Sequence, residues 1–242
     1  MMSIESIRSE FASKLKRQDF VINKDGSKVL EIVGAQFIAS DDHIFGKPNH
    51  QYIQHELEWY QSQSLNVNDI PGKTPAIWEM VSSDKGEINS NYGWCIFSLE
   101  NGNQYRNVCA ALYNQPSTRQ AVMIYTRPSM HTDSVRDGMT DFMCTNAVQY
   151  LIRNNKIHAI VNMRSNDAWA GYRNDVAWQK HVLLKLSRDL QIEAGDIIWQ
   201  AGSLHVYEPQ FYLVDAYAKT GRTHIARKEY DNNGPLGQYE LF

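Results

Sequence analysis

Apolar residues at helical spacing predict three amphipathic helices along the chain. The first is expected over residues 3–16, with Ser3 as its amino-terminal cap. A second helix is expected over residues 49–64, and a third over residues 174–192, which Asn174 can cap. In each segment the apolar positions recur every three or four residues, so one face of the helix can pack against the rest of the protein.

Apolar runs rich in β-branched residues predict strands between these helices. Strands are expected over residues 28–40 and 119–127. Residues 194–219 predict either two strands, or one strand followed by a short helix. The polar residues 229–242 are expected to form a loop or a tail. No repeat, low-complexity tract or linker divides the chain, so we expect one domain over residues 1–242.

The segment CTNAVQYLIRNNKIHAIVNMRS (144–165) carries the clearest pairing signal. Two alternating runs lie on either side of Asn154 and Asn155. Asparagine tolerates a positive φ, so these two residues predict a two-residue hairpin turn. Such a turn pairs Ile152 with Ile157 and fixes the register of both strands.

The same register makes a prediction about Cys144. Carried back along the hairpin, it places Cys144 opposite Ser165, on one face and with Cβ atoms about 5 Å apart. Arg164 should then point to the other face, unless a bulge or a twist turns it round. A lone cysteine on a strand is more often structural than reactive. A neighbouring guanidinium stabilises a thiolate, however, and Arg164 therefore favours the interpretation of Cys144 as a nucleophile.

Composition and charge narrow the function classes. The chain has 242 residues, of which 43% are hydrophobic, so it can form a sizeable core. Its net charge of −3 favours neither a general nucleic-acid binder nor a membrane-surface protein. Three cysteines without a CxxC pair argue against a disulfide framework or a zinc site, and no metal is expected. No signal-peptide or membrane-spanning run is evident, so we expect a cytoplasmic protein.

The second predicted helix contains two candidate carboxylates. Its apolar stripe is expected to consist of Ile53, Leu57 and Tyr60. Glu56 and Glu58 are two residues apart, so they point in different directions from a helix. Glu58 can face solvent, whereas Glu56 is expected near the side of Tyr52 and Tyr60. Read from spacing alone, both are interpreted as surface acids.

Two further patterns bring polar side chains together on predicted strands. The strand end NMRSND (162–167) can be a solvated strand end, but its arginine beside a serine hydroxyl is also a natural grip for a phosphate. Lys24 and Arg119 are basic residues that could join it. In GSLHVY, strand alternation places His205 and Tyr207 on one face. By itself, His205 is interpreted as a satisfied structural histidine.

Taken in order, these motifs resemble the thymidylate synthase superfamily, from about residue 20 to residue 218. The specific resemblance is to its hydroxymethylating branch, the deoxycytidylate (dCMP) hydroxymethylases of T-even bacteriophages. The resemblance to the superfamily is carried by HELEWY, IWEM, NYG, STRQ, MCTN, RSND, GYRND and GSLHVY. The resemblance to this branch is carried by GEINSNYGW, MIYTRPSM, DFMCTN, VQYLIR, VNMRSND and GSLHVY. The resemblance implies an α+β fold with three layers, and a large mixed β-sheet that forms the interface of a homodimer.

The resemblance also implies roles for individual residues. Cys144 would be the nucleophile that adds to C6 of the pyrimidine, and Glu56 would organise water and proton transfer. The substrate-binding residues would be Lys24, Arg164 and Ser165 for the 5′-phosphate, Arg119 for the phosphate in the partner subunit, and His205 and Tyr207 for the sugar 3′-hydroxyl. Trp78, Tyr92 and Asp167 would lie towards the folate and the pyrimidine.

The implied reaction transfers a one-carbon unit from 5,10-methylenetetrahydrofolate to C5 of dCMP. Water would complete the product, 5-hydroxymethyl-dCMP, and tetrahydrofolate would leave. Asp175 would select the base, because thymidylate synthases have asparagine at this position. A carboxyl group accepts from the cytosine 4-amino group and matches N3 if a proton lies between them. A place at the start of a helix would bias Asp175 towards the anion, but the sequence leaves the position of the proton open.

Three other activities remain compatible with these residues. One is a hydroxymethylase of the ribonucleotide CMP, and another is a methylase or hydroxymethylase of dUMP, against which Asp175 argues. The third is a catalytically silent nucleotide-binding protein. The chain also departs from the family pattern at Gln120, where a second arginine is usual, and this predicts weaker nucleotide binding. A viral enzyme of this kind would act in the host cytoplasm.

Overall fold

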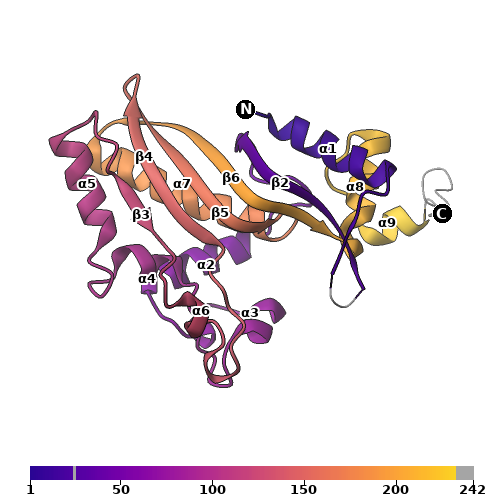
Figure 1. Ribbon diagram of the computed structural model, residues 1–242, viewed down its shortest axis with the longest axis horizontal. Helices are drawn as coiled ribbons and strands as arrows, with labels where there is room; N and C mark the ends of the chain where they lie inside the picture. Colours follow the sequence, from indigo (N-terminus) through magenta and orange to yellow (C-terminus); the bar gives the residue numbers. More distant parts are fainter. Residues whose placement is uncertain (24–25, 233–242) are drawn as a thin grey trace. The chain divides into compact units, whose positions relative to one another are not determined.

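The computed structural model describes residues 1–23 and 26–232. Its strands are β1 (Val21–Ile22), β2 (Lys28–Ile38), β3 (Val122–Ile124), β4 (Thr145–Arg153), β5 (Lys156–Asp167) and β6 (Glu193–Tyr207). Its helices are α1 (Ile4–Lys16), α2 (His50–Ser62), α3 (Ala76–Val81), α4 (Tyr92–Phe97), α5 (Gln104–Asn114), α6 (Met130–Asp133), α7 (Gly171–Leu190), α8 (Phe211–Thr220) and α9 (Arg227–Asn232). The strands form one sheet in the order β1-β2-β6-β5-β4-β3 (Figure 1). The expected α+β class is confirmed.

The chain divides into two compact units, each assembled from separate segments. The first comprises Met1–Pro48, Ser165–Ala177 and Trp199–Phe242, and the second comprises Asn49–Arg164 and Trp178–Ile198. The elements β5, α7 and β6 each continue from one unit into the other. The expectation of one domain stays a prediction. In the part of the chain that the structure describes, no helix combines the length and apolar character needed to cross a membrane.

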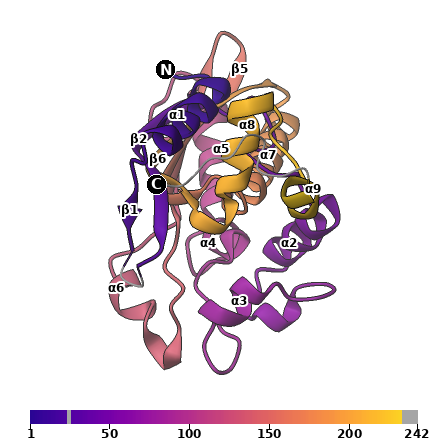
Figure 2. The same ribbon diagram turned by 90° about the vertical axis from the view of Figure 1, so that its right-hand side faces the viewer.

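In the first unit, α1 packs against β2 and α8 (Figure 2). The hydroxyl of Ser3 accepts a hydrogen bond from the backbone N–H of Ser6 at 3.1 Å, so the predicted helix and its cap are confirmed. Ile7 and Phe11 are fully buried on the apolar face of α1. The amphipathic pattern of this segment therefore becomes part of the core.

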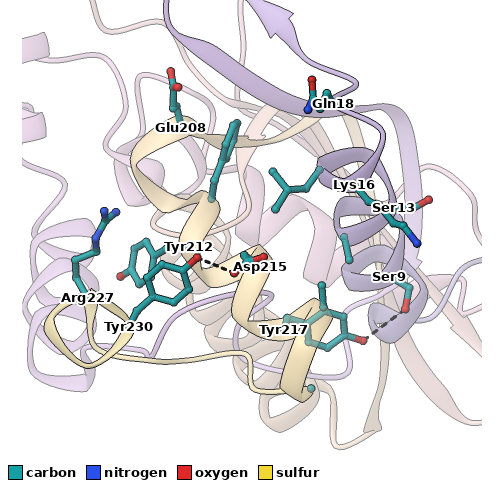
Figure 3. Close-up of a pocket in the computed structure, with 15 residues that line it drawn as sticks. Ser9, Ser13, Lys16, Gln18, Glu208, Tyr212, Asp215, Tyr217, Arg227 and Tyr230 are labelled. Carbon is teal, nitrogen blue, oxygen red and sulfur yellow. Dashed lines mark hydrogen bonds between the residues drawn. The ribbon is translucent and has the colours of Figure 1, made fainter. Parts of the chain in front are cut away.

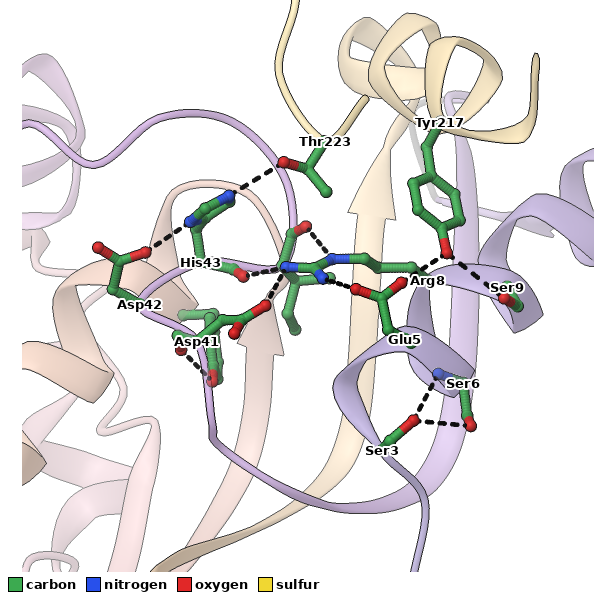
Figure 4. A network of polar contacts seen from close by, with 12 residues as sticks. Ser3, Glu5, Ser6, Arg8, Ser9, Asp41, Asp42, His43, Tyr217 and Thr223 are labelled. Atoms are coloured by element: carbon green, nitrogen blue, oxygen red, sulfur yellow. Dashed lines mark hydrogen bonds and ion pairs between the residues drawn. The ribbon is translucent and has the colours of Figure 1, made fainter. Parts of the chain in front are cut away.

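A buried arginine joins α1 to the loop that follows β2. Arg8 is only 2% exposed, and its Nε donates to the carbonyl of Ile44 at 2.9 Å (Figure 4). Its Nη2 donates to the carbonyl of His43 and to the carboxylate of Asp41, both at 2.8 Å. A buried guanidinium is stable only when its donors are satisfied, and this network satisfies them with two backbone carbonyls of the loop and with the carboxylates of Asp41 and Glu5.

In the second unit, an aromatic cluster forms much of the core. The ring of Tyr60 stacks on Tyr92 with centroids 5.2 Å apart, and it meets Trp178 edge-on at 5.0 Å. Gly93 lies directly against the backbone of Tyr60, where a Cβ atom would collide with the carbonyl oxygen. This close approach of α2 and α4 therefore requires glycine at position 93.

The predicted hairpin is also found in the second unit, between β4 and β5. Asn154 and Asn155 form the turn with φ angles of 51° and 62°. Ile152 pairs with Ile157, as the two-residue turn requires. The turn chemistry and the register next to it are thus confirmed.

Further along the hairpin, the register differs from the prediction. The ladder slips by one residue between Thr145 and Ala147. Beyond this β-bulge, the N–H of Arg164 donates to the carbonyl of Cys144 at 2.8 Å. The predicted pairing of Cys144 with Ser165 is therefore wrong, because a bulge gives one strand an extra residue and shifts every later pair.

The buried face of α2 also differs from the prediction. Its buried residues are Glu56, Trp59 and Tyr60, whereas Ile53 and Leu57 are only partly buried. Compared with the prediction, the inward face of α2 is rotated towards Trp59, because its indole ring buries more apolar area than an aliphatic side chain. A carboxylate is carried into the interior with it.

The third helix begins earlier than expected. α7 starts at Gly171, so Asn174 lies inside its first turn and is not its cap. The carboxylate of Asp167 accepts from the backbone N–H of Trp169 at 2.9 Å and of Ala170 at 3.1 Å. This turn directs the chain into the helix before the predicted cap is reached.

The remaining predicted elements are largely confirmed. The strand expected over residues 119–127 is shorter, since β3 covers only Val122–Ile124. Residues 194–219 form a strand followed by a helix, which was the second of the two alternatives. Part of the predicted loop or tail is helical in α9, and residues 233–242 lie outside the described residues.

Candidate active site

The β-bulge places a guanidinium beside the thiol of Cys144. The Nη2 atom of Arg164 lies 3.6 Å from the Sγ atom of Cys144. The same guanidinium is held by two backbone carbonyls, with Nε 3.2 Å from the oxygen of Met143 and Nη2 3.0 Å from that of Phe142. It also lies over the Phe142 ring, 5.0 Å from its centroid. A cation fixed in this way favours the thiolate form of the neighbouring cysteine.

The other two cysteines lie in environments that disfavour a thiolate. Cys95 is 2% exposed, and its burial raises the pKa of the thiol to about 12. Burial also raises the pKa of the Cys109 thiol, and the nearby Asp189 carboxylate adds to this effect. Cys144 is partly exposed and has the arginine contact, so it is the best suited of the three to act as a nucleophile.

Glu56 lies in a buried chain of polar groups. Its side chain is 5% exposed, and its Oε1 accepts from the hydroxyl of Tyr52 at 2.7 Å. That hydroxyl in turn accepts from the indole N–H of Trp78 at 2.8 Å. Burial raises the pKa of Glu56 to about 7, although its hydrogen bonds act in the opposite direction. The interpretation of Glu56 as a surface acid is wrong, whereas Glu58 is exposed as expected.

Tyr92 and Arg119 occupy contrasting positions in the second unit. Tyr92 is 4% exposed and lies in the aromatic cluster, with its ring edge-on to Tyr125 at 5.4 Å. Arg119 is exposed, like the neighbouring Gln120. The backbone carbonyl of Arg119 accepts from the side chain of Gln149 at 2.8 Å, which ties this segment to β4. The roles predicted for Tyr92 and Arg119 stay predictions.

In the first unit, a buried amide contacts the candidate base-selecting acid. The Nδ2 atom of Asn166, which is 3% exposed, donates to Oδ2 of Asp175 at 2.7 Å. The helix α7 begins at Gly171, so Asp175 lies beyond its first turn. The expected influence of a helix start on Asp175 is therefore wrong, and the hydrogen bond from Asn166 takes its place. A donor to a carboxylate favours the ionised form.

His205 and Tyr207 lie on one face of β6, as strand alternation predicts. Their rings meet edge-on with centroids 4.8 Å apart. His205 is 8% exposed and its Nδ1 lies 3.4 Å from the hydroxyl of Ser203, while Tyr207 is 43% exposed. The hydroxyl of Ser203 donates to the carboxylate of Glu31 on β2. The imidazole is thus placed beside a fixed polar group.

The remaining predicted site residues are divided between the two units. Ser165 is the first residue of the second segment of the first unit, directly after Arg164. Both carboxylate oxygens of Asp167 accept backbone N–H groups of the turn before α7. Lys24 lies outside the described residues. The second unit brings together Cys144 with Arg164 and Glu56 with Trp78, and it also holds Tyr92 and Arg119. The first unit holds Ser165, Asp167, Asp175, His205 and Tyr207.

A cavity in the first unit lies apart from these groups. It has a volume of about 970 Å³ and is lined by side chains of α1, α8 and α9 (Figure 3). None of the predicted site residues lines it. Two of its polar groups are engaged with each other in a hydrogen bond of 2.6 Å from the hydroxyl of Tyr230 to Asp215. Within the described residues, no three His, Cys, Asp or Glu side chains gather as a metal site would require.

Comparison with known proteins identifies the family. The family model described as thymidylate synthase matches residues 24–231. The chain belongs to the thymidylate synthase family. Within this family it is 58% identical over 236 residues to "Deoxycytidylate 5-hydroxymethyltransferase" of Enterobacteria phage T4, a match that covers 95% of this chain and 96% of the relative.

Two further relatives match at different levels of identity. The "Deoxycytidylate 5-hydroxymethyltransferase" of Enterobacteria phage T2 is 57% identical over 237 residues, again with 95% and 96% of the two chains covered. A "Thymidylate synthase" of Francisella tularensis subsp. holarctica (strain LVS) is 24% identical over 165 residues, which are 64% of this chain and 60% of the relative. The resemblance to this family on ordered motifs is thus confirmed.

Two polar residues of the candidate site had no predicted role. Tyr52 donates to Glu56 from one helical turn away, so the expected proximity of the two residues is confirmed, but no hydrogen bond between them was predicted. Asn166 donates to Asp175 across nine residues, between the end of a strand and a helix. No periodicity connects the two, so this contact depends on the tertiary structure.

Proposed function

We propose that this chain is a dCMP hydroxymethylase. It transfers a one-carbon unit from 5,10-methylenetetrahydrofolate to C5 of dCMP and adds water, giving 5-hydroxymethyl-dCMP and tetrahydrofolate. The observation that carries the proposal is the contact of 3.6 Å between the Arg164 guanidinium and the Cys144 thiol. The identity of 58% to a relative named deoxycytidylate 5-hydroxymethyltransferase supports the choice of substrate and reaction.

Cys144 begins and ends the chemistry on the pyrimidine. Its thiolate adds to C6, and the electron pair of the C5–C6 bond makes C5 nucleophilic, like an enamine carbon. The folate co-substrate supplies the one-carbon unit when bound. After the proton on C5 is lost and the hydroxymethyl group is complete, the Sγ–C6 bond breaks and the thiolate is regenerated. Arg164 stabilises the anionic sulfur at both stages.

Glu56 is suited to handle the proton of the attacking water. A pKa of about 7 leaves the carboxyl group divided between its two forms near neutral pH, which is where a general base works best. The hydroxyl of Tyr52 fixes one carboxylate oxygen and is itself fixed by Trp78. We infer that ionised Glu56 takes a proton from the water that completes the hydroxymethyl group.

Asp175 and Asn166 act together in the choice of base. An ionised carboxylate accepts from the 4-amino group of cytosine, whereas it would repel the O4 atom of uracil. Since Asn166 donates to Oδ2 of Asp175, the carboxylate is favoured as the anion. We infer that the shared proton therefore lies on cytosine N3, which also makes the ring more electrophilic at C6.

The remaining groups bind the two substrates. Trp78 is partly buried on α3, where the neighbouring Ile77 and Met80 are 55% and 68% exposed, so this helix offers the apolar surface that a folate ring system needs. The 5′-phosphate is assigned to Lys24, Arg164, Ser165 and the Arg119 of the partner subunit in a homodimer, and the 3′-hydroxyl to His205 and Tyr207. The reaction is expected in the cytoplasm of a phage host.

A product assay tests this proposal directly. The purified protein is incubated with 5,10-methylenetetrahydrofolate and either dCMP, CMP or dUMP, and the products are identified by mass spectrometry. We expect dCMP to gain a hydroxymethyl group. Turnover of CMP in preference to dCMP would reassign the sugar, turnover of dUMP alone would contradict the role of Asp175, and turnover of none would leave a binding protein.

A further inference from the structure

The short segment that precedes Cys144 is held by a buried carboxylate. Asp141 is 6% exposed and accepts three hydrogen bonds. Its Oδ2 accepts from the backbone N–H of Asn89 at 2.7 Å and of Ser90 at 2.8 Å, and its Oδ1 accepts from the hydroxyl of Ser90 at 2.6 Å. Both carboxylate oxygens are therefore used within the second unit, to join two loops that are about fifty residues apart in the sequence.

The hydrogen bonds continue along the segment as far as the thiol. The N–H of Thr140 donates to the carbonyl of Val81 at 2.9 Å. The carbonyls of Phe142 and Met143 are the two acceptors that hold the guanidinium of Arg164. Every residue from Thr140 to Met143 thus contributes a polar contact, and the guanidinium at the end of this series lies 3.6 Å from the Cys144 sulfur.

The side chain of Asn89 adds a second link between the same loops. Its Nδ2 donates to the backbone carbonyl of Asp141 at 3.2 Å, and its Oδ1 accepts from Arg127 at 3.1 Å. Arg127 is in turn paired with Asp133 at 2.9 Å. Asp141 is therefore embedded in a connected network, in which each group restricts the geometry of the next.

We propose that Asp141 is a positioning residue for the Cys144 thiol. By fixing the loop, it fixes the two carbonyls that hold the Arg164 guanidinium against the sulfur. The inference rests on the proposed role of Cys144 as the nucleophile. Asp141 itself contacts neither the sulfur nor Arg164 by any hydrogen bond that the structure describes, so its action is through the backbone of residues 142 and 143.

Because Asp141 is negatively charged, a positioning role and a purely electrostatic role of its carboxylate predict different effects on the Cys144 thiol. Loss of a negative charge near Arg164 and Cys144 would by itself make the thiolate easier to form. Loss of the geometry would have the opposite effect, because the guanidinium would no longer be held beside the sulfur. The two effects move the pH dependence of thiol reactivity in opposite directions.

The test is the alkylation of Cys144 by iodoacetamide as a function of pH, read for each cysteine by mass spectrometry of peptides. In Asp141→Asn, an amide replaces a carboxylate that has three donors, and one oxygen acceptor is lost. We expect the midpoint of the Cys144 rate profile to move to higher pH, and the rate at pH 7 to fall roughly fivefold. A midpoint that is unchanged or moves to lower pH would overturn the proposal.

Two other variants complete the experiment. Ser90→Ala removes one donor and keeps the carboxylate, so it should shift the midpoint in the same direction by less, and it serves if Asp141→Asn does not fold. Asp189→Asn is the matched control. Asp189 lies in the same unit and accepts a hydrogen bond from Tyr105 at 2.7 Å, and its replacement by asparagine removes the same charge. It should lower stability and leave the Cys144 profile unchanged.

The alkylation assay needs neither dCMP nor folate, so it separates this proposal from the proposed function. An upward shift in a protein that does not convert dCMP would support the positioning role and contradict the reaction. If the protein converts dCMP but neither Asp141→Asn nor Ser90→Ala shifts the midpoint of the Cys144 rate profile, the reaction would be supported and the positioning role contradicted. In the active enzyme, kcat of Asp141→Asn should fall with the alkylation rate.

Discussion

Arg164 and Cys144 are brought together by a slip of one residue in the β4–β5 ladder. The bulge between Thr145 and Ala147 shifts the pairing, and Arg164 becomes the residue opposite Cys144. In an unbroken register, the side chain of Arg164 would point away from Cys144, on the other face of the hairpin. A contact of 3.6 Å between guanidinium and sulfur therefore depends on a local irregularity of the sheet. Bulges commonly redirect a side chain next to an active site.

The first prediction concerns the nucleophile. Cys144→Ser should lower kcat for dCMP by about 10³-fold or more, because a hydroxyl beside Arg164 does not ionise at neutral pH. The measurement is product formation under saturating dCMP and folate. Retention of more than a tenth of the activity would contradict covalent catalysis by Cys144.

The controls for this prediction are the other two cysteines. Burial raises the pKa of both thiols, so neither supplies a thiolate near neutral pH. Cys95→Ser and Cys109→Ser should keep most of the turnover, although Cys95→Ser buries a hydroxyl and should lower stability by roughly 1–3 kcal/mol. Comparable losses of activity in all three variants would point to misfolding.

The hairpin shows how far the sequence determines this part of the site. Two asparagines between alternating runs were sufficient to predict the turn and the pair Ile152–Ile157, because turn chemistry and strand periodicity are local properties. The bulge has no such signature. No glycine marks it, and it arises where the strand meets the loop held by Asp141. The residue opposite Cys144 could therefore not be predicted.

The burial of Glu56 was missed for a related reason. The apolar stripe of α2 was expected to consist of Ile53, Leu57 and Tyr60, and Glu56 was interpreted as a surface acid. In the structure, Trp59 is fully buried and turns the helix, so that Glu56 enters the interior. Helical periodicity predicts that a face is buried, but large aromatic side chains decide which face.

The second prediction concerns the choice of base. Asp175→Asn should shift the ratio of kcat/KM from dCMP towards dUMP by about tenfold or more, because an amide can donate to O4 of uracil and accept from its N3–H. The ratio is measured in a mixture of both nucleotides, with product masses as the readout. An unchanged ratio would remove Asp175 from base selection.

The third prediction separates Asn166 from Asp175. Asn166→Ala removes the donor at 2.7 Å from Asp175 and so weakens the preference of this carboxyl group for its ionised form. Activity on dCMP should fall about tenfold, equivalent to one hydrogen bond to a charged group, with no gain of activity on dUMP. A gain on dUMP would mean that Asn166 contacts the base directly.

The fourth prediction concerns the missing arginine. Gln120 is exposed beside Arg119, where a second guanidinium could add charge to the phosphate site. Gln120→Arg should tighten the binding of dCMP about twofold to fivefold, as expected for one exposed ion pair. Deoxycytidine is the control ligand, because it lacks the phosphate and should bind unchanged. If dCMP does not bind more tightly, position 120 has no direct role in phosphate binding.

The fifth prediction follows from the raised pKa of Glu56. In the folded protein the carboxyl group holds its proton up to a pKa of about 7, against 4.5 for the ordinary group. The folded state therefore binds the proton more tightly than the unfolded chain, and stability falls as the pH rises between these two values. The difference between the two pKa values corresponds to about 3 kcal/mol in the free energy of unfolding, and this stabilisation is fully lost above pH 7.

Glu56→Gln should remove the pH dependence of stability and, at the same time, the proposed catalytic base. The amide oxygen can still accept from Tyr52, so the buried hydrogen bond is kept. Denaturant unfolding between pH 5 and pH 9 should show the variant more stable than the parent at high pH by up to about 3 kcal/mol, and similar at low pH. At the same time kcat should fall by about 10²-fold or more and lose its rise near pH 7. A variant that is inactive but gains no stability at high pH would show that Glu56 is not a buried, proton-binding carboxylate.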